Sequence, residues 1–553
     1  MDNIENENVI QEQIEQQNEE IEFNYSHAPV LKPLFELGKR DTTFALCALA
    51  ASVFSAVFGI FGGFAFGYLL STAFMIILFS VYFIHNKNVG ILPIIFGLLG
   101  IANSAVFICT TNGSVRFFGV VVSFLLSLVF FDGVVNGNQN GNRQTASVIY
   151  KALSTVGNTG VSLKSLLLTS KGEKKVVGKV MLGLLCAIPV LIIVVPLLIS
   201  SDDAFSGMMS SIFSNSGNAF LTVLKVVFGA IVSMFVISYG FSLKYNRTAK
   251  TRESQFKGIE SVCIISFLSA IALCYLLYLF SQLAYFFSAF SGFLPNDKIT
   301  YAEYARKGFF EMCVIAVINL GVVFLSMLLA KKQNGKVNVG IRMTATFISV
   351  FTLIIIATAI SKMVLYINEF GMTVLRITTS AFMIFLAVVF IAVILRIYVN
   401  KINIVKTALI TAGIAVLLLG TANVNAVCAR YNYESYKEGR LDTIDIETLY
   451  NLGDEGIPYV VKLACSKDKD VAQEAQRYLV EAYFYDYFDD MERSEKFSVE
   501  DLKKNQKDKG FSYFSIPKAK AYDELYNFIE SNPQFSSYCQ THFRERVYND
   551  DWF

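Results

Sequence analysis

Long apolar stretches recur along most of this chain, and they constrain its fold more than any other feature. Runs of about 20 residues, dominated by apolar side chains, follow one another between residues 44 and 422. A helix of about 20 apolar residues crosses a bilayer core about 30 Å thick. Each run can therefore span a membrane as an α-helix, whereas a β-barrel would show shorter segments of alternating hydrophobicity.

The composition of the whole chain agrees with this interpretation. Of the 553 residues, 54% are hydrophobic and only 17% are charged, against about 25% charged in a soluble domain. We predict an all-α fold, a polytopic transmembrane helix bundle with about 11 spans. The predicted spans are residues 43–60, 64–84, 90–109, 116–132, 177–199, 219–243, 259–281, 307–330, 344–366, 379–398 and 405–422.

Basic residues in the loops between these runs indicate how the chain is oriented. The loop at residues 200–218 contains no Lys or Arg, whereas four other loops are rich in them. Because short cytoplasmic loops carry an excess of Lys and Arg, the basic loops are predicted to be cytoplasmic. The N-terminus is then cytoplasmic, and an odd number of spans places the C-terminus outside the cytoplasmic membrane. The basic loops are residues 133–176, 244–258, 331–343 and 396–406.

The first basic loop contains a segment with two interpretations. Residues 146–170 are half apolar and carry scattered lysines. They are predicted either as two short helices on the inner membrane surface, broken at Gly157–Gly160, or as a plain loop. The sequence does not choose between these alternatives.

Composition also divides the chain into three regions. Residues 1–41 begin with an acidic stretch rich in Gln and Asn and are predicted to be a disordered tail. Residues 42–423 contain the apolar runs and form the predicted transmembrane domain. In residues 424–553 charged and tyrosine side chains become dense, and their periodicity predicts a small α-helical soluble domain, extracytoplasmic in this topology. Cys465 and Cys539 would share that domain, where a disulfide is chemically permitted.

Charged residues near the outer ends of the predicted spans form the one candidate polar site. Glu303, Lys307 and Glu311 are four residues apart, so their side chains can pair along one helix face. Ionisable residues within a membrane are costly and are candidates for function. The alternative is structural, because Lys and Arg near helix ends also snorkel, and ion pairs hold helices in register. The candidate outer-face charge cluster consists of Asp202, Asp203, Lys225, Glu303, Arg306, Lys307, Glu311, Lys362, Glu369 and Arg376.

The sequence contains none of the common catalytic motifs searched for. It contains no G-x-S-x-G, H-E-x-x-H or Walker motif and no Rossmann glycines after a strand. No C-x-x-C occurs, and none of the three histidines falls within a predicted span, so we expect no metal and no cofactor. The basic residues occupy short loops and do not form a binding face, so nucleic acid is not an expected partner.

Four stretches of the chain resemble a known family. YAEYARKGFFE, at residues 301–311, looks like the signature of bacterial multi-pass membrane proteins known as domain of unknown function 4173, related to group 4153. The chain departs from the usual pattern at Phe370, where tyrosine is expected, and at Met372, where leucine is expected. The resemblance covers roughly residues 180–460 and implies fold and location, but no activity, cofactor or substrate. The three supporting stretches are SDDAF at 201–205, LYINEFGMTVLR at 365–376 and ARYN at 429–432.

Three classes of function are compatible with these features. The first is an envelope scaffold or sensor, whose external helical domain binds an envelope protein while the spans anchor it in the lipid bilayer. The second is a transporter or lipid-handling protein, with a small-molecule ligand at the outer-face charge cluster. The third is a membrane-embedded transferase that uses Glu311 or Asp203 as its base. We rank them in this order, and no recognisable catalytic motif indicates an enzyme.

Overall fold

Helices account for the regular structure of the chain. The computed structural model contains helices in all described parts, and one parallel β-bridge joins Ile259 to Ala330. The all-α prediction is therefore confirmed for these parts. The structure describes residues 37–63, 65–83, 90–136, 142–169, 203–245, 259–291, 309–331, 337–399, 402–488 and 511–539.

Within these ranges, nine helices are long and apolar enough to cross a membrane. They match nine of the predicted spans. The predicted span 64–84 is a shorter apolar helix, α3 (Phe66–Tyr82), and the predicted span 177–199 lies outside the described residues. The total of about 11 spans therefore stays a prediction. The nine are α2 (Lys39–Phe54) with its π-helical continuation η1 (Ser55–Ile60), α4 (Ile91–Cys109), α5 (Gly113–Asn136), α9 (Asp203–Lys244), α10 (Ser261–Ser291), α12 (Phe309–Leu329), α13 (Val339–Phe370), α14 (Val374–Tyr398) and α15 (Ile404–Thr421).

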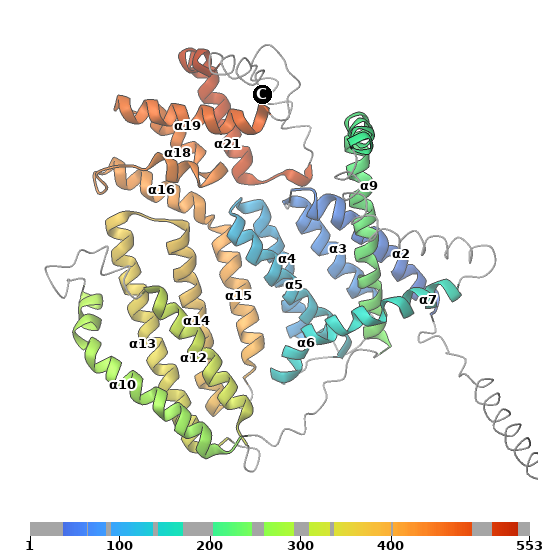
Figure 1. The fold of residues 1–553 in the computed structure, drawn as a ribbon, viewed down its shortest axis with the longest axis vertical. Helices are drawn as coiled ribbons and strands as arrows, with labels where there is room; N and C mark the ends of the chain where they lie inside the picture. Colours follow the sequence, from blue (N-terminus) through green and yellow to red (C-terminus); the bar gives the residue numbers. More distant parts are fainter. Residues whose placement is uncertain are drawn as a thin grey trace, which may run out of the picture.

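The membrane helices form two groups joined by α15 (Figure 1). The first group contains α2 to α5 and α9, around a core that includes Phe79, Phe130 and Phe241. The second contains α10 and α12 to α14, around cores that include Phe351 and Phe390. Helix α15 contacts α14 on one side and α4 and α5 on the other, so it ties the two groups together.

Short polar residues start several of these helices. The side chains of Asn338, Thr373, Asn403 and Asn423 each accept a hydrogen bond from a backbone amide in the first turn of α13, α14, α15 and α16 (Val424–Lys437), respectively. Such N-caps satisfy amides that have no partner within the helix. Gly371, with φ of 75°, ends α13 in the left-handed region that glycine adopts at no steric cost, so the chain reverses directly into α14.

Residues 424–488 and 511–539, called the cap below, form a helical layer across one end of the bundle (Figure 1). The cap has its own apolar core, which includes Leu449, Leu479, Leu525 and Ile529. Cys465 is exposed and Cys539 is buried in this core, and both are free thiols, so the permitted disulfide does not form. The cap elements are α16 (Val424–Lys437), α17 (Ile446–Tyr450), η3 (Gly453–Glu455), α18 (Ile457–Ala464), α19 (Lys469–Phe488), η4 (Phe511–Tyr513) and α21 (Ile516–Ser531).

The two ends of the bundle differ in composition. The capped end contains the connections at residues 61–65, 109–113, 371–373 and 421–424, against which the cap lies. The basic end is the opposite one, and Lys39, Arg40, Lys244, Lys331, Arg342, Arg396 and Lys406 lie there, at the other ends of the same helices.

Two short helices lie at the basic end, in the segment for which the sequence left two alternatives. Helix α6 (Asn142–Ser154) and helix α7 (Thr159–Thr169) are joined by the 3-10 turn η2 (Thr155–Asn158), which contains Gly157. The plain-loop alternative is therefore wrong. Ile149, Tyr150 and Leu153 of α6 are 47%, 60% and 65% exposed, so this helix presents apolar side chains outward.

Candidate functional site

The structure describes the side chains of four members of the predicted outer-face charge cluster. These are Lys225, Glu311, Lys362 and Arg376. Glu311, Lys362 and Arg376 lie toward the capped ends of their helices. Lys225, near the middle of α9, lies one turn before Phe228, whose ring contacts Phe61 at the capped end. Asp203 is the first residue of α9 and Glu369 lies in the last turn of α13, and the side chains of both lie outside the described part. The members wholly outside the described residues are Asp202, Glu303, Arg306 and Lys307.

Lys362 and Glu311 lie on two adjacent helices, Lys362 buried and Glu311 exposed. Lys362 is 7% exposed on α13, and Glu311 lies in the first turn of α12. The two helices pack against each other in opposite directions, so the end of α13 lies beside the start of α12 (Figure 1). The two charges interact electrostatically. An ammonium group in a membrane helix needs a nearby anion, and Glu311 supplies one.

Arg376 and Lys225 lie elsewhere at the same end. The Arg376 guanidinium lies 4.1 Å from the ring centre of Tyr366 and donates to the carbonyl oxygens of Phe370, at 3.1 Å, and Gly371. Arg376 therefore closes the turn between α13 and α14. Lys225 lies on α9, in the other helix group. The described charges thus share one end of the bundle but occupy separate places.

A second buried charge, Glu455, lies where the cap meets the bundle. It is 4% exposed in the cap, and its Oε1 accepts hydrogen bonds from the Thr111 amide at 2.7 Å and the Thr110 hydroxyl at 3.2 Å. Its Oε2 accepts from the Thr111 hydroxyl and from the Asn425 amide group at 3.5 Å. The guanidinium of Arg116, in the first turn of α5, compensates the buried charge electrostatically. Glu455 therefore binds the α4–α5 connection to the cap.

Two asparagines at the start of the cap hold other connections of the bundle. The Asn432 side chain accepts a hydrogen bond from the Met372 amide at 2.8 Å and donates to the Met372 carbonyl at 2.9 Å. It thereby joins the α13–α14 connection to α16. Asn423 donates to the Cys109 carbonyl at 2.9 Å. The cap is thus fastened to both helix groups.

The connection between η1 and α3 supplies another attachment point. The Tyr513 hydroxyl donates to the Phe61 carbonyl at 3.2 Å, and the Phe511 ring stacks on Phe58 with centroids 5.6 Å apart. Gly63 has φ of 85°, and the Tyr513 ring occupies the space that a Cβ there would take. Only glycine fits this close approach, which brings the cap against the first two membrane helices.

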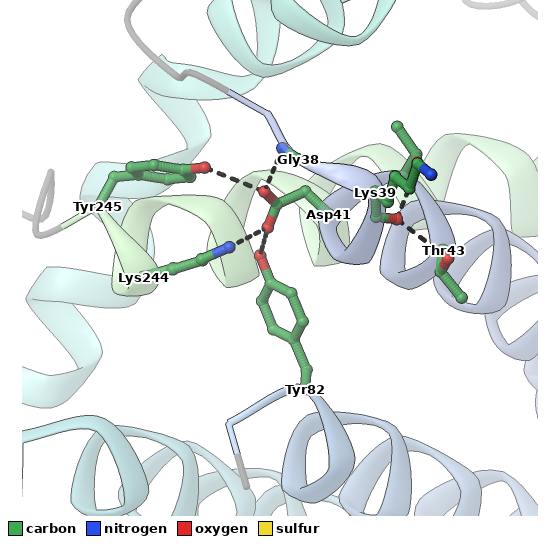
Figure 2. A network of polar contacts seen from close by, with 8 residues as sticks. Gly38, Lys39, Asp41, Thr43, Tyr82, Lys244 and Tyr245 are labelled. Atoms are coloured by element: carbon green, nitrogen blue, oxygen red, sulfur yellow. Dashed lines mark hydrogen bonds and ion pairs between the residues drawn. The ribbon is translucent and has the colours of Figure 1, made fainter. Parts of the chain in front are cut away.

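A buried aspartate forms the corresponding contact at the basic end (Figure 2). The Asp41 side chain is 2% exposed, and its Oδ1 accepts from the Lys244 ammonium group and from the Tyr82 hydroxyl at 2.5 Å. Its Oδ2 accepts from the Tyr245 hydroxyl at 3.0 Å and the Gly38 amide at 2.8 Å. These contacts join the start of α2, the end of α3 and the end of α9.

The chemistry of Asp41 and Glu455 follows from their hydrogen bonding. An ionised carboxylate offers about four lone-pair sites, and each of these two receives four donors. Neither has a free acceptor site for a substrate proton, so both act as structural clamps between distant segments. Among the described residues, no group of three or more His, Cys, Asp or Glu side chains is arranged to hold a metal ion.

Neither clamp residue, Asp41 or Glu455, was predicted from the sequence, and the reason differs between the two. Asp41 stands at the edge of the first apolar run, where the sequence indicated the last residue of the tail, and Lys244 was interpreted only as an orientation signal. Glu455 lies in an acidic stretch, DEG, that is typical of a solvated turn. Lys362 and Glu311 were found because charge within an apolar run is visible in the sequence itself.

The helices and their connections define a multi-pass transmembrane protein. The chain belongs to the family described as domain of unknown function (DUF4153), whose model matches residues 73–463. The match begins within α3, so it leaves out α2 and η1 and includes the rest of both helix groups. It extends through α16 and α17 into α18, so the Glu455, Asn425 and Asn432 contacts lie within the family region. No curated protein and no solved structure matches the chain. The finer resemblance to group 4173 stays a prediction.

Proposed function

We propose that this protein is a scaffold or sensor of the bacterial cell envelope, in which the bundle anchors the cap on the outer side of the cytoplasmic membrane. One observation carries the proposal. Glu455, a buried carboxylate of the cap, takes all four of its hydrogen bonds at the boundary of the cap and the α4–α5 connection. A polar contact of this kind is expensive to open, so the cap is coupled to the membrane helices and is not loosely tethered.

The coupling reaches both helix groups and α15. Met372, Val374 and Ile377 of the second helix group and Leu419 of α15 pack against the apolar core of the cap. The first group contributes Thr110 and the η1–α3 connection. A partner that binds and displaces the cap would therefore change the relative positions of both helix groups. This is the mechanical requirement for a sensor, and a rigidly held cap equally serves a scaffold.

The proposed orientation of the protein in the membrane is based on the distribution of Lys and Arg between the two ends of the bundle. Seven described Lys and Arg residues lie at the basic ends of the membrane helices, against Arg116 and Arg376 in the first turns of α5 and α14 at the capped end. This excess supports a cytoplasmic location for the basic end. Cys465 is exposed on the cap and reports its side of the membrane. In intact cells, a membrane-impermeant maleimide should label Cys465. Labelling only after the cells are opened would reverse the orientation.

A transporter or lipid-handling protein is the second candidate, favoured by one observation. Lys362 and Glu311 place interacting opposite charges on the adjacent helices α13 and α12 within the membrane-spanning region, where ionisable groups commonly belong to a substrate path. On this alternative, a small molecule or lipid headgroup would exchange with the Glu311–Lys362 pair at the outer face.

One comparison of variants separates the two candidates. Cells that lack the protein are complemented with Glu455→Gln or with Lys362→Gln, and the protein level is measured for each by immunoblot. A scaffold or sensor predicts that Glu455→Gln loses complementation at normal protein level, while Lys362→Gln retains it. The reverse pattern would refute the scaffold and support transport. Glu434→Gln is the matched control, because Glu434 is an exposed cap carboxylate that pairs only with Arg430 at the surface.

A further inference from the structure

An exposed aromatic segment of the cap lies at the level where the membrane helices end. Phe511, Phe514 and Ile516 are 54%, 50% and 55% exposed, and Tyr513 is 37% exposed. Large apolar side chains gathered in six consecutive positions are unusual for a surface that faces only water. The face formed by Phe511, Tyr513, Phe514 and Ile516 is called the aromatic edge below.

Contacts on both sides of the aromatic edge show at which level of the bundle it lies. On one side, Phe511 packs against Phe58 and Phe66, which belong to η1 and α3 at their capped ends. On the other side, α21 begins at Ile516 and contacts α4, which also ends there, at Cys109. Phe514 lies in the chain between these two contacts. The segment is therefore level with the ends of three membrane-spanning elements (Figure 1).

Exposed apolar side chains continue from the aromatic edge down the bundle. Phe61, beside Tyr513, is 41% exposed, and Phe74, farther along α3, is 43% exposed. On a helix at the outside of a membrane bundle, side chains of this kind face lipid. The aromatic edge extends the same surface past the helix ends and into the layer where aromatic residues of membrane proteins concentrate.

Side chains along α21 change from apolar near the membrane helices to charged farther from them, as expected at a membrane surface. A hollow of about 420 Å³ runs along the first part of α21. Phe514 and Ile516 line it where the helix begins, and Lys520, Asp523 and Glu524 line it farther along the helix. Figure 1 shows α21 rising away from the bundle from its first residue. The wall is thus apolar near the helix ends and charged above them, as the headgroup layer is apolar below and hydrated above.

We propose that the aromatic edge is a membrane anchor of the cap, with Phe514 and Ile516 inserted among the phospholipids of the leaflet at the capped end. The occupant is the upper acyl-chain and glycerol region of a bilayer. This inference depends on the membrane position of the bundle and not on the scaffold proposal, because it holds whichever compartment the capped end faces. It adds a lipid contact to the protein contacts that hold the cap.

Tryptophan fluorescence in lipid vesicles tests the anchor. The single Trp552 is replaced by Phe, Phe514→Trp is introduced, and the full chain is reconstituted into phosphatidylcholine vesicles with or without bromine near the top of the acyl chains. We expect the emission of the introduced tryptophan to be blue-shifted and quenched several-fold by the brominated lipid. Emission typical of water without quenching would overturn the proposal, and so would blue-shifted emission without quenching, which would mean that protein covers the site.

The control uses the far end of the same helix. Tyr538 is 40% exposed on residues 533–539, which follow α21 and pack on it through Phe535 and Phe528. The 16 residues of α21 rise about 24 Å, so the turn into residues 533–539 lies at the opposite end of α21 from Phe514. Tyr538→Trp in the same background is expected to be unquenched, and equal quenching at both positions would overturn the proposal. Protection of buried Cys539 from alkylation shows that each variant is folded.

Discussion

Replacing Glu455 by alanine should detach the cap from the α4–α5 connection. The substitution removes the acceptor for the Thr111 amide, the Thr111 and Thr110 hydroxyls and the Asn425 side chain. It also removes the charge that compensates the partly buried Arg116 guanidinium. The buried Thr110 hydroxyl and the half-buried Thr111 amide then lose this acceptor, whereas the Asn425 amide group still donates to the Leu452 carbonyl at 2.8 Å.

The magnitude follows from the kind of contact that is lost. Removing one member of a buried charge network costs about 3–5 kcal/mol, and a single hydrogen bond to a charged group contributes about 1.5–3 kcal/mol. We expect Glu455→Ala to cost at least about 3 kcal/mol of cap attachment, which is about a 100-fold increase in the detached population. Glu455→Gln keeps the shape and one acceptor oxygen, so its cost should be about 1–2 kcal/mol.

Hydrogen exchange measures this attachment directly. The Thr111 amide donates to Glu455, so its exchange rate reports the opening of the contact. The expected order of exchange is Glu455→Ala fastest, then Glu455→Gln, then the wild type. Glu434→Gln, which removes only an exposed ion pair with Arg430, should leave the rate unchanged. Equal Thr111 protection in Glu455→Ala and in the wild type would refute the assignment of Glu455 as a clamp.

Further predictions concern the other contacts and the thiols. Asn432→Ala should weaken cap attachment by about 1–3 kcal/mol, because it removes both hydrogen bonds to the α13–α14 connection; unchanged proteolysis of the cap would contradict this. Asp41→Asn should lower the melting temperature in detergent more than Lys244→Met, because the amide cannot accept from all four donors; equal melting temperatures would argue against the clamp. Cys465 should react rapidly with maleimide at pH 8 and Cys539 should not, because burial raises the pKa of the Cys539 thiol to about 12. Since the unfolded thiol ionises near its ordinary value of 9.0, stability of the cap should fall as pH rises from there to about 12, which chemical denaturation at pH 8 and pH 11 would detect.

The membrane helices were predictable because their signal is local. Apolar side chains repeat within each run, so α4, α5, α12, α14 and α15 could be located within a few residues of their observed bounds. The start of α2 was placed too late, since a charged first turn does not look like a span until Asp41 is seen with its partners. The sequence assigned Lys362 and Glu311 to the same outer-face cluster, because both charges interrupt apolar runs, but it paired Glu311 with Lys307 and did not predict the interaction with Lys362.

The clamps could not be predicted in the same way. Glu455 and Thr111 are separated by 344 positions, and Asp41 and Lys244 by 203. Nothing in the local composition of either stretch distinguishes a buried carboxylate from a solvated one. Which loops meet at one end depends on the packing of α15 between the two helix groups, and this is a property of the whole bundle.

The sequence by itself determined that the chain forms several helices long and apolar enough to cross a membrane, and it predicts that the basic loops share one side, because hydrophobic length and charge act on each segment separately. Only the tertiary structure decided which residues hold the cap and where its aromatic edge lies relative to the helix ends. A carboxylate that is buried must take its donors from whatever segments surround it, and those neighbours exist only after the helices have packed.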